Sequence, residues 1–299
     1  TVLCKSEGDP INAGLIIVDE VSMLDLETAS YLFAAVKNGT ILILCGDDNQ
    51  LESVGYGKVL ADLIDCGKVE IYRLYQIMRQ SGTICENASA ILKGITNIKT
   101  DKTFSLSHYS SDKEAVEAMM QNLIYRQSFV LSPIKNKDVS GVYALNKKIQ
   151  GSVSDLSYCF SHNKERYHIG DRIIMTQTNY EQGYFNGDIG TISSYCDGIA
   201  TVIFFDKTLT LSRDDFSNMQ LAYSITVHKS QGSEIEDVHI VLPDSCKNML
   251  TRRIVYTAIT RAKSHVYIYS VGNAFEYAVK NKAEHQRQSN LVYRITGDR

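Results

Sequence analysis

Short, unbroken apolar runs alternate with helix-like patterns over residues 14–75, and this alternation most limits the folds open to the chain. The apolar runs cover residues 15–18, 41–45 and 69–74, and apolar residues at helical spacing cover residues 26–36 and 58–65. Strands that read as unbroken apolar runs are typical of parallel sheets, which helices cover on both faces. The first quarter of the chain therefore predicts an α/β fold with a parallel sheet.

The α/β pattern continues after residue 81 and is interrupted once by short strands. Predicted helices cover residues 83–93, 112–126, 139–150 and 248–260, and predicted strands cover residues 129–132, 224–227, 238–241 and 266–270. Between about 156 and 222 the predicted strands are short, at residues 172–178, 190–195, 199–205 and 208–212. The Asn186-Gly187 and Asp197-Gly198 pairs mark tight turns there. We expect this stretch to form a small antiparallel barrel inserted into an α/β domain.

Composition narrows the classes of partner. With 31 Lys and Arg against 34 Asp and Glu the net charge is -3, so any binding of nucleic acid depends on local basic patches. The apolar runs are shorter than the roughly 18 residues that a membrane-spanning helix requires, so we expect no membrane partner. Seven cysteines without a C-x-x-C pair favour neither a zinc site nor a disulfide framework. Reduced thiols and a cytoplasmic location are the expectation.

Two predicted strands end in polar residues that suit nucleotide chemistry. The run at 15–18 leads directly into Asp19 and Glu20, and the run at 41–45 leads into Gly46-Asp47-Asp48-Asn49-Gln50. The carboxyl ends of parallel strands share one edge of a sheet, where α/β folds bind ligands. An apolar strand ending in Asp-Glu is a Walker B pattern, in which Asp holds the Mg²⁺ shell and Glu positions and deprotonates a water. Taken alone, each stretch is better explained as a solvated strand end.

Two more polar blocks lie downstream. Residues 226–234 (TVHKSQGSE) follow a predicted strand, and residues 256–263 (YTAITRAK) lie on or just after a predicted helix. In this order and spacing the four blocks resemble motifs II, III, V and VI of superfamily 1 helicases, specifically the RecD-like branch named after the alpha subunit of exodeoxyribonuclease V. Residues 73–80 (RLYQIMRQ) resemble motif IV, and residues 170–172 and 185–188 resemble the small inserted domain of that branch.

This resemblance implies a fold and a division into domains. The fold is α/β, with RecA-like motor domains of the P-loop NTPase class and a small SH3-like antiparallel β-barrel insert. Residues 1–75 would form the C-terminal part of the first motor domain. Residues 76–155 and 223–299 would form the second, and residues 156–222 the insert.

The resemblance also implies roles for single residues. The catalytic residues would be Glu20, Gln50, Arg79 and Arg261, with Gln50 reporting the γ-phosphate of ATP and both arginines facing it. The nucleotide contacts would be Asp19, which holds Mg²⁺ through water, Gly232 and Glu234, which binds the ribose. The DNA contacts would be Ser132, Thr226, His228 and Lys229. A purely structural role for His228 remains open, and Lys263 is better explained as a solvated charge.

Three aromatic residues of the predicted insert share one long loop: Tyr180, Tyr184 and Phe185. Exposed rings there could stack on bases, which is worth about 1–3 kcal/mol each. We assign Tyr184 to the DNA site on this basis. Packing of the ring inside the barrel is an equally good interpretation.

One family motif is missing. No G-x-x-x-x-G-K-[ST] loop occurs in the 299 residues. Gly55-Tyr56-Gly57-Lys58 lacks the leading glycine and has Val59 where a hydroxyl should hold Mg²⁺. In the family this loop lies upstream of the Asp-Glu strand. We therefore expect the chain to be the C-terminal part of a helicase, inactive by itself.

The function expected of the whole protein is that of an ATP-dependent DNA helicase that moves 5′ to 3′ on single-stranded DNA and acts at duplex junctions in repair and recombination. Its cofactors would be ATP and Mg²⁺, and subunits of a recombination complex could be its partners. Two alternatives stay open. The chain could be the helicase part of a conjugative relaxase, or a non-catalytic DNA-binding or assembly module, which the missing phosphate loop favours.

Overall fold

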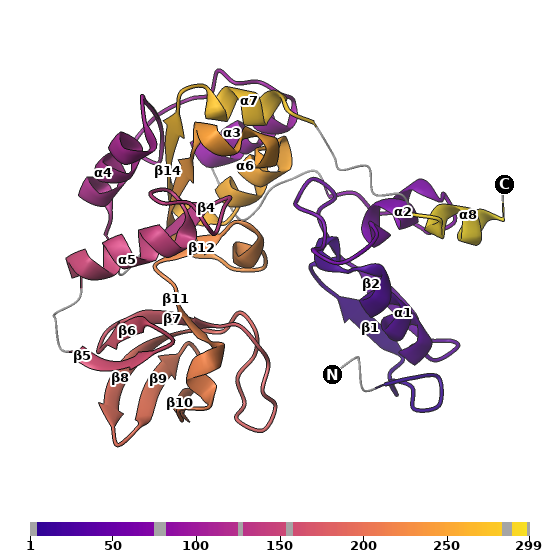
Figure 1. Ribbon diagram of the computed structural model, residues 1–299. Helices are drawn as coiled ribbons and strands as arrows, with labels where there is room; N and C mark the ends of the chain where they lie inside the picture. The colour runs from indigo at the N-terminus through magenta and orange to yellow at the C-terminus, as the bar shows by residue number, and fades with distance from the viewer. Residues whose placement is uncertain (1–4, 75–81, 125–127, 154–157, 283–288, 298–299) are drawn as a thin grey trace. The chain divides into compact units, whose positions relative to one another are not determined.

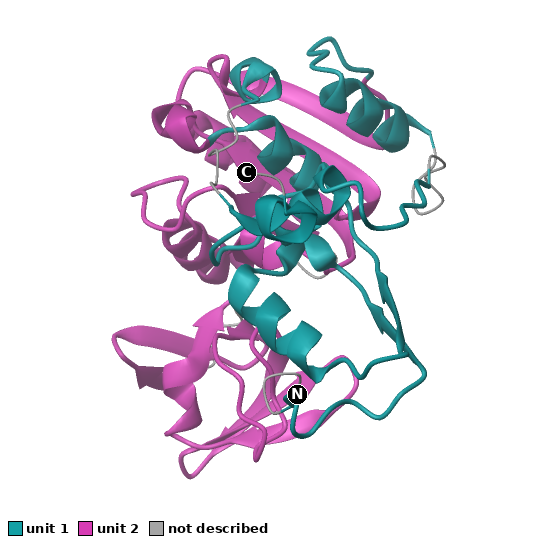
Figure 2. Cartoon of the chain, turned by 90° about the vertical axis from the view of Figure 1, so that its right-hand side faces the viewer, with its two compact units in different colours: residues 1–99, 250–260, 276–299 teal, residues 100–249, 261–275 magenta. Residues whose placement is uncertain are grey.

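The structure is a computed structural model that describes residues 5–74, 82–124, 128–153, 158–282 and 289–297. The chain forms two compact units, coloured teal and magenta in Figure 2. Unit 1 comprises Thr1–Lys99, Leu250–Thr260 and Glu276–Arg299, and unit 2 comprises Thr100–Met249 and Arg261–Phe275. Each unit is therefore assembled from segments that are distant in the sequence.

A two-stranded parallel sheet lies near the start of unit 1. Strands β1 (Leu15–Val18) and β2 (Ile41–Leu44) pair from Leu15 opposite Ile41 to Val18 opposite Leu44, and helix α1 (Leu26–Ala35) connects them (Figure 1). The Asp25 side chain accepts a hydrogen bond from the Thr28 backbone N–H at 2.8 Å and so caps α1. The predicted strand, helix and strand are confirmed here.

The other helices of unit 1 come from both ends of the chain. Helix α2 (Val59–Asp65) contacts α8 (Leu291–Thr296), and α3 (Thr83–Leu92) contacts α6 (Arg252–Ile259). The strand predicted at residues 69–74 is wrong, because no strand forms there and its apolar side chains are exposed. An apolar run gains the stability of a strand only when neighbours bury it. Among the described residues, no helix is both long and apolar enough to cross a membrane.

A five-stranded parallel sheet forms the centre of unit 2, in the order β12-β4-β13-β14-β3. The strands are β3 (Phe104–Tyr109), β4 (Ser128–Ser132), β12 (Ser224–Thr226), β13 (Ile235–Leu242) and β14 (Ala262–Val271). Helix α4 (Asp112–Asn122) packs against β3, β13 and β14, whereas α5 (Val142–Val153) packs against β4 and β12. Helix α7 (Ala274–Lys280) follows β14. A parallel sheet flanked by helices confirms the predicted α/β fold class.

An antiparallel sheet interrupts this arrangement between α5 and β12. Its order is β10-β9-β8-β7-β11, and the strands are β7 (Arg172–Met175), β8 (Ile189–Cys196), β9 (Ile199–Phe204), β10 (Thr208–Leu211) and β11 (Met219–Leu221). A hairpin of β5 (Tyr158–His162) and β6 (Glu165–His168) precedes it. The β8–β9 turn has positive φ at both Asp197 (49°) and Gly198 (85°), as a tight hairpin turn requires. The predicted strands are confirmed, whereas the SH3-like assignment and the domain boundaries remain predictions.

Asp171 joins this antiparallel sheet to the rest of unit 2. Its fully buried carboxylate accepts hydrogen bonds from Gln150 Nε2 of α5 at 2.6 Å, from the Tyr223 hydroxyl at 2.8 Å and from the His168 backbone N–H at 2.8 Å. Burial raises the pKa of Asp171, and these hydrogen bonds oppose that rise. The hydrogen bonds therefore compensate a buried charge and fix the antiparallel sheet to α5.

Candidate functional site

The two predicted acidic strand ends lie side by side in unit 1. The Cys45 backbone N–H donates to Val18 O at 2.8 Å, and the Val21 N–H donates to Cys45 O at 2.9 Å, so the chain after β1 runs beside the chain after β2. Asp19 and Glu20 therefore occupy the same sheet edge as the segment that begins at Gly46. This is the edge at which parallel sheets bind ligands.

Glu20 has a left-handed backbone, with φ 53° and ψ 40°. Few residues other than glycine adopt this conformation, and those that do cluster at functional sites. The Glu20 backbone N–H donates to the Asp19 side chain at 2.8 Å, which orients the Asp19 carboxylate against this turn. The sequence pattern predicts the residue but not its backbone, because the signals for left-handed turns are glycine and asparagine.

The edge fits Mg²⁺ chemistry through water. Asp19, Glu20 and Asp47 supply carboxylate oxygens, the ligand type that Mg²⁺ prefers. Over the ranges that the structure describes, no group of three or more His, Cys, Asp or Glu side chains is arranged to hold a metal ion. Mg²⁺ commonly keeps several of its waters and takes only one or two protein carboxylates. A magnesium site held through water at this edge remains a prediction.

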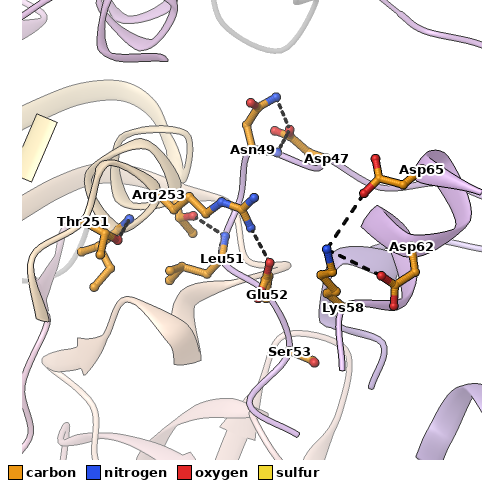
Figure 3. Close-up of polar contacts among 12 residues, drawn as sticks. Asp47, Asn49, Leu51, Glu52, Ser53, Lys58, Asp62, Asp65, Thr251 and Arg253 are labelled. Atoms are coloured by element: carbon orange, nitrogen blue, oxygen red, sulfur yellow. Dashed lines mark hydrogen bonds and ion pairs between the residues drawn. The ribbon is translucent and has the colours of Figure 1, made fainter. Parts of the chain in front are cut away.

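Helix α6 holds the loop that follows β2. The Tyr256 hydroxyl donates to Asp47 Oδ2 at 2.9 Å, and the Leu51 backbone N–H donates to Thr257 Oγ1 at 3.0 Å. Arg253 Nη1 donates to Glu52 Oε1 at 2.9 Å, as Figure 3 shows. Three side chains of α6 thus contact residues 47–52, which include Gln50.

Gln50 is buried within this loop. Its Nε2 lies 3.4 Å from Asp47 Oδ2, the oxygen that also accepts the Tyr256 hydroxyl. A neighbouring pocket of about 20 Å³, lined by Ser22, Asp47, Gln50 and Arg253 among others, has room for about one water molecule. The loop is therefore tightly packed and cannot itself enclose a nucleotide.

A basic pocket of about 220 Å³ lies at the start of α6. It is lined by Asn49, Leu92, Thr251, Arg252, Arg253, Asn281 and Lys282. The three cationic side chains favour an anion over a cation there. Sequence reasoning missed this group. The Arg252-Arg253 pair just before motif VI was its only visible signal, because Leu92 and Lys282 come from remote parts of the chain.

The glycine-rich stretch at residues 55–58 is structural. A Cβ atom on Gly57, whose φ is +91°, would lie 2.4 Å from Leu26 Cγ, and Tyr56 O accepts a hydrogen bond from the Leu26 N–H at 2.9 Å. Lys58 Nζ lies 3.7 Å from the buried carboxylate of Asp62 (Figure 3). The loop packs against the start of α1 and its lysine is already paired, so it differs from a phosphate-binding loop.

The motif V and VI residues of unit 2 form a second group. Arg261 is only 1% exposed, its Nη1 lies 3.5 Å from Ser233 O, and its own carbonyl accepts the Ile235 N–H at 2.9 Å. Gly232, with φ 75°, and Glu234 belong to the same turn, and Glu234 forms an ion pair with Lys263 at 2.7 Å. Lys263 therefore pairs with Glu234, a residue predicted to bind the nucleotide, and sequence reasoning missed this contact.

The residues predicted to act on ATP do not all belong to one unit of the structure. Arg79 lies outside the described residues. Arg261 belongs to unit 2, whereas Asp19, Glu20 and Gln50 belong to unit 1. The roles of the two arginines remain predictions.

The residues predicted to contact DNA differ in their surroundings. Ser132 is fully buried, and its hydroxyl donates to Ser140 O at 2.8 Å, so the structure does not support a direct contact through that hydroxyl. The buried Thr226 hydroxyl accepts the Lys229 N–H at 3.2 Å and shapes the turn. His228 and Lys229 are partly exposed. Burial, and then the charge of Lys135, lower the pKa of Lys229, so two cationic groups lie near each other here.

The expectation of an exposed Tyr184 ring is wrong. Tyr184 is fully buried, its hydroxyl donates to Asp215 Oδ1 at 2.9 Å and accepts from Asn218 Nδ2 at 3.2 Å. The ring therefore packs inside the inserted region, which was the alternative interpretation. Tyr180 and Phe185 of the same loop are 64% and 45% exposed, with ring centroids 6.0 Å apart.

Sequence comparisons link the chain to known proteins. Residues 7–114 match the AAA domain family, and residues 221–269 match the UvrD-like helicase C-terminal domain family. The chain is 31% identical over 292 residues to the ATP-dependent RecD2 DNA helicase of Deinococcus radiodurans, covering 96% of this chain and 40% of that protein. It is 28% identical over 298 residues to the RecBCD enzyme subunit RecD of Mycolicibacterium smegmatis, covering 90% of this chain and 52% of that protein. The chain spans about half the length of these relatives or less.

Solved structures are similar in fold. The Pif1 helicase from Bacteroides in complex with ADP-AlF3 and ssDNA aligns with a TM-score of 0.58 at 17% identity, covering 92% of this chain and 73% of that one. A structure of two Pif1 helicases at forked dsDNA aligns with a TM-score of 0.57 at 16% identity, covering 91% and 72%. Identity this low bears on the fold alone, and it agrees with the parallel sheets and flanking helices described above.

Proposed function

This chain is a homologue of the RecD-like helicases of superfamily 1, and from that premise we propose that it forms part of an ATP-dependent motor that unwinds DNA. The observation that carries the proposal is the parallel pairing of β1 and β2, which brings Asp19, Glu20 and the Asp47–Gln50 segment to one sheet edge. An NTPase needs carboxylates for metal and water beside a group that senses the phosphate, all on one rigid support.

Each residue of the edge would have a separate task in ATP hydrolysis. Mg²⁺ bound through water near Asp19 would neutralise charge on the phosphates. Glu20 would accept a proton from the attacking water. Gln50 would hydrogen-bond the terminal phosphate or that water, which a buried and fixed amide can do without reorganising.

The two predicted arginine fingers complete the proposal. Arg79 and Arg261 would stabilise the charge that develops on the transferred phosphoryl group. Because Arg261 is buried against Ser233 O, it would have to leave that contact to reach a phosphate. Glu234 would likewise exchange Lys263 for the ribose hydroxyls.

The DNA path would run along unit 2. Lys229, the neighbouring Lys135 and His228 supply positive charge for phosphates, although the whole chain is slightly acidic. We propose movement from 5′ to 3′ on single-stranded DNA towards duplex junctions, in line with the RecD-like resemblance. Association with subunits of a recombination complex and a cytoplasmic location belong to the same proposal.

A further part of the motor would lie outside these 299 residues. The sequence has no phosphate-binding loop, and the chain aligns with 40% of the RecD2 relative. One face of the β1–β2 sheet is exposed, since Ile17 is 61% and Ile41 63% exposed. Parallel sheets are normally covered on both faces. Additional strands and the phosphate-binding loop, contributed by further sequence, would cover this sheet.

The test is DNA-stimulated ATP hydrolysis and strand separation by the native protein that contains this chain. We expect Glu20→Gln to reduce turnover by at least about a hundredfold while ATP binding persists. Loss of unwinding with retained DNA binding would agree with a motor. A native protein that binds DNA but has no ATPase sensitive to Glu20 would instead favour the non-catalytic module, the alternative that the missing loop supports.

A further inference from the structure

One face of helix α6 contacts the loop after β2 through three side chains. Arg253, Tyr256 and Thr257 are spaced at i, i+3 and i+4, so they lie on the same side of the helix. They contact Glu52, Asp47 and Leu51, respectively. The contacts join residues more than 200 positions apart in the sequence, since the Tyr256–Asp47 separation is 209 residues.

Asp47 lies between Tyr256 and Gln50. A carboxylate only accepts hydrogen bonds, so the amide nitrogen of Gln50, rather than its oxygen, must face Asp47 Oδ2. The buried Tyr256 hydroxyl donates to the same oxygen, and hydrogen bonds to charged acceptors are stronger and more directional than neutral ones. Asn49 holds the other oxygen, since its backbone N–H donates to Asp47 Oδ1 at 2.9 Å, so Tyr256 is the donor that restrains the oxygen facing the Gln50 amide.

We propose that Tyr256 is a positioning residue that acts through Asp47 to set the orientation of the Gln50 amide. The inference rests on the proposed function, in which Gln50 acts on the terminal phosphate or the attacking water. With one N–H directed at Asp47, the second N–H and the carbonyl oxygen of Gln50 have fixed directions. Without the Tyr256 hydroxyl, Asp47 Oδ1 stays bound to the Asn49 backbone N–H at 2.9 Å, but Oδ2 loses the donor that it shares with the Gln50 amide. The amide then faces a less restrained acceptor and its orientation is less fixed.

The experiment measures steady-state ATP hydrolysis by the native protein with saturating single-stranded DNA. Tyr256→Phe removes one hydroxyl and keeps the ring. We expect kcat to fall about tenfold, the size of effect that loss of one charged hydrogen bond produces, with the KM for ATP within about twofold of wild type. A purely structural role would instead change the melting temperature and KM together.

A double-mutant cycle with Gln50→Ala tests whether Tyr256 acts through Gln50. If it does, Tyr256→Phe lowers kcat in the wild-type background and has no further effect once Gln50 is alanine. An equal loss in both backgrounds would overturn the inference. Tyr31→Phe, which removes a partly exposed hydroxyl from α1 in the same unit, is the matched control and should leave kcat unchanged.

The outcomes separate this inference from the proposed function. A native protein that hydrolyses ATP in a Glu20-dependent way, but in which Tyr256→Phe turns over at the wild-type rate, would overturn the inference alone. A native protein without such hydrolysis would overturn the proposed function, and the inference with it.

Discussion

Glu20 combines a catalytic residue type with an uncommon backbone. A left-handed conformation costs a residue with a Cβ atom roughly 1–2 kcal/mol, whereas glycine adopts it freely. The carboxylate would be retained in spite of this cost because the turn directs it along the sheet edge beside Asp19. The residue therefore trades stability for position.

Replacing Glu20 by glycine should reveal that trade. We expect Glu20→Gly to raise the free energy of unfolding by up to about 1 kcal/mol, because strain is relieved and part of the gain is lost to chain entropy. Hydrolysis of ATP should disappear at the same time. The matched control is Glu27→Gly in the first turn of α1, which should lower the free energy of unfolding by about 1 kcal/mol. Thermal unfolding of the three proteins decides, and a lower melting temperature for Glu20→Gly would contradict the strain argument.

His239 makes stability depend on pH. Burial lowers the pKa of His239 to about 4, whereas the unfolded chain titrates near 6.5. Between these values the unfolded state binds more protons, so stability is full above about pH 6.5 and is lost as the pH falls towards 4, by up to about 3 kcal/mol.

We expect His239→Phe, which keeps a ring against Tyr267, to remove much of this loss. Melting temperatures of wild type and variant at roughly pH 7.5, 6 and 5 measure how much less stability the variant loses as the pH falls. Substitution of the exposed His108 by Phe is the control. A variant with the same pH dependence as wild type would exclude His239 as the source.

At the residue scale, some assignments follow from sequence and others do not. The positions of Asp19, Glu20 and Gln50 after the strands are predictable because an apolar run fixes where each strand ends, whereas their roles remain predictions. The environment of Tyr184 is not predictable, because its hydroxyl bonds to Asp215 and Asn218, more than 30 residues away, which face it only in the folded protein. The partner of Lys263 is not predictable either, because Glu234 precedes β13 and Lys263 lies near the start of β14, and the two meet only when these strands pair.

At the scale of elements, the loop of residues 176–188 contains aromatic residues with opposite environments. Tyr184 is buried against Asp215 and Asn218, whereas Tyr180 lies at the surface with its ring edge-on to Phe185. Lys207 Nζ lies 4.9 Å from the centroid of the Phe185 ring and forms an ion pair with Asp188 of the same loop at 2.8 Å. A surface of this kind suits stacking on unpaired bases.

We therefore expect Tyr184→Ala and Tyr180→Ala to have different effects. Tyr184→Ala should destabilise the protein by about 3–5 kcal/mol, the usual cost of removing a large buried ring. Tyr180→Ala should keep the wild-type melting temperature and weaken single-strand binding by about 1–3 kcal/mol at every salt concentration, with an unchanged salt slope. Fluorescence anisotropy across a salt series checks this. Wild-type affinity in a stable Tyr180→Ala protein would remove this loop from the DNA site.

Strands with continuous apolar sequences, and alternating strands beside a clear turn signal such as β8, were predictable, whereas one polar edge strand was not. β4, β13 and β14 read clearly from the sequence because both faces are covered. β3 (FSLSHY) was missed, because an edge strand with serine and histidine on alternate positions lacks an apolar run. The false strand at residues 69–74 is the converse error, an apolar run that no neighbouring element buries.

At the scale of the whole molecule, the sequence contains the acidic strand ends proposed for nucleotide hydrolysis but lacks a phosphate-binding loop. The acidic edge is present, but no loop with backbone N–H groups and a lysine for the phosphates occurs in the sequence. Lys58, the nearest candidate by sequence, is paired with Asp62. The missing motif predicts that the chain is part of a longer motor, and this remains a prediction.

We therefore expect the isolated 299-residue chain to hydrolyse ATP negligibly, with or without single-stranded DNA. Phosphate release in a malachite-green assay measures this, and the native protein is the positive control. DNA-stimulated turnover of the isolated chain that Glu20→Gln abolishes would show that the phosphates have another binding site within these residues.

The exposed face and edges of the β1–β2 sheet have a practical consequence for handling this polypeptide. Within the described residues β1 and β2 each have one strand neighbour, so each leaves a row of backbone N–H and C=O groups unpaired beside exposed isoleucines. Such edges recruit identical edges from other molecules, and the product is aggregate. The chain expressed by itself would therefore accumulate in inclusion bodies or on chaperones, and its yield of dispersed protein would fall steeply with concentration. We expect that addition of the further strands proposed above, or substitution of Ile17 or Ile41 by lysine, would keep the protein dispersed.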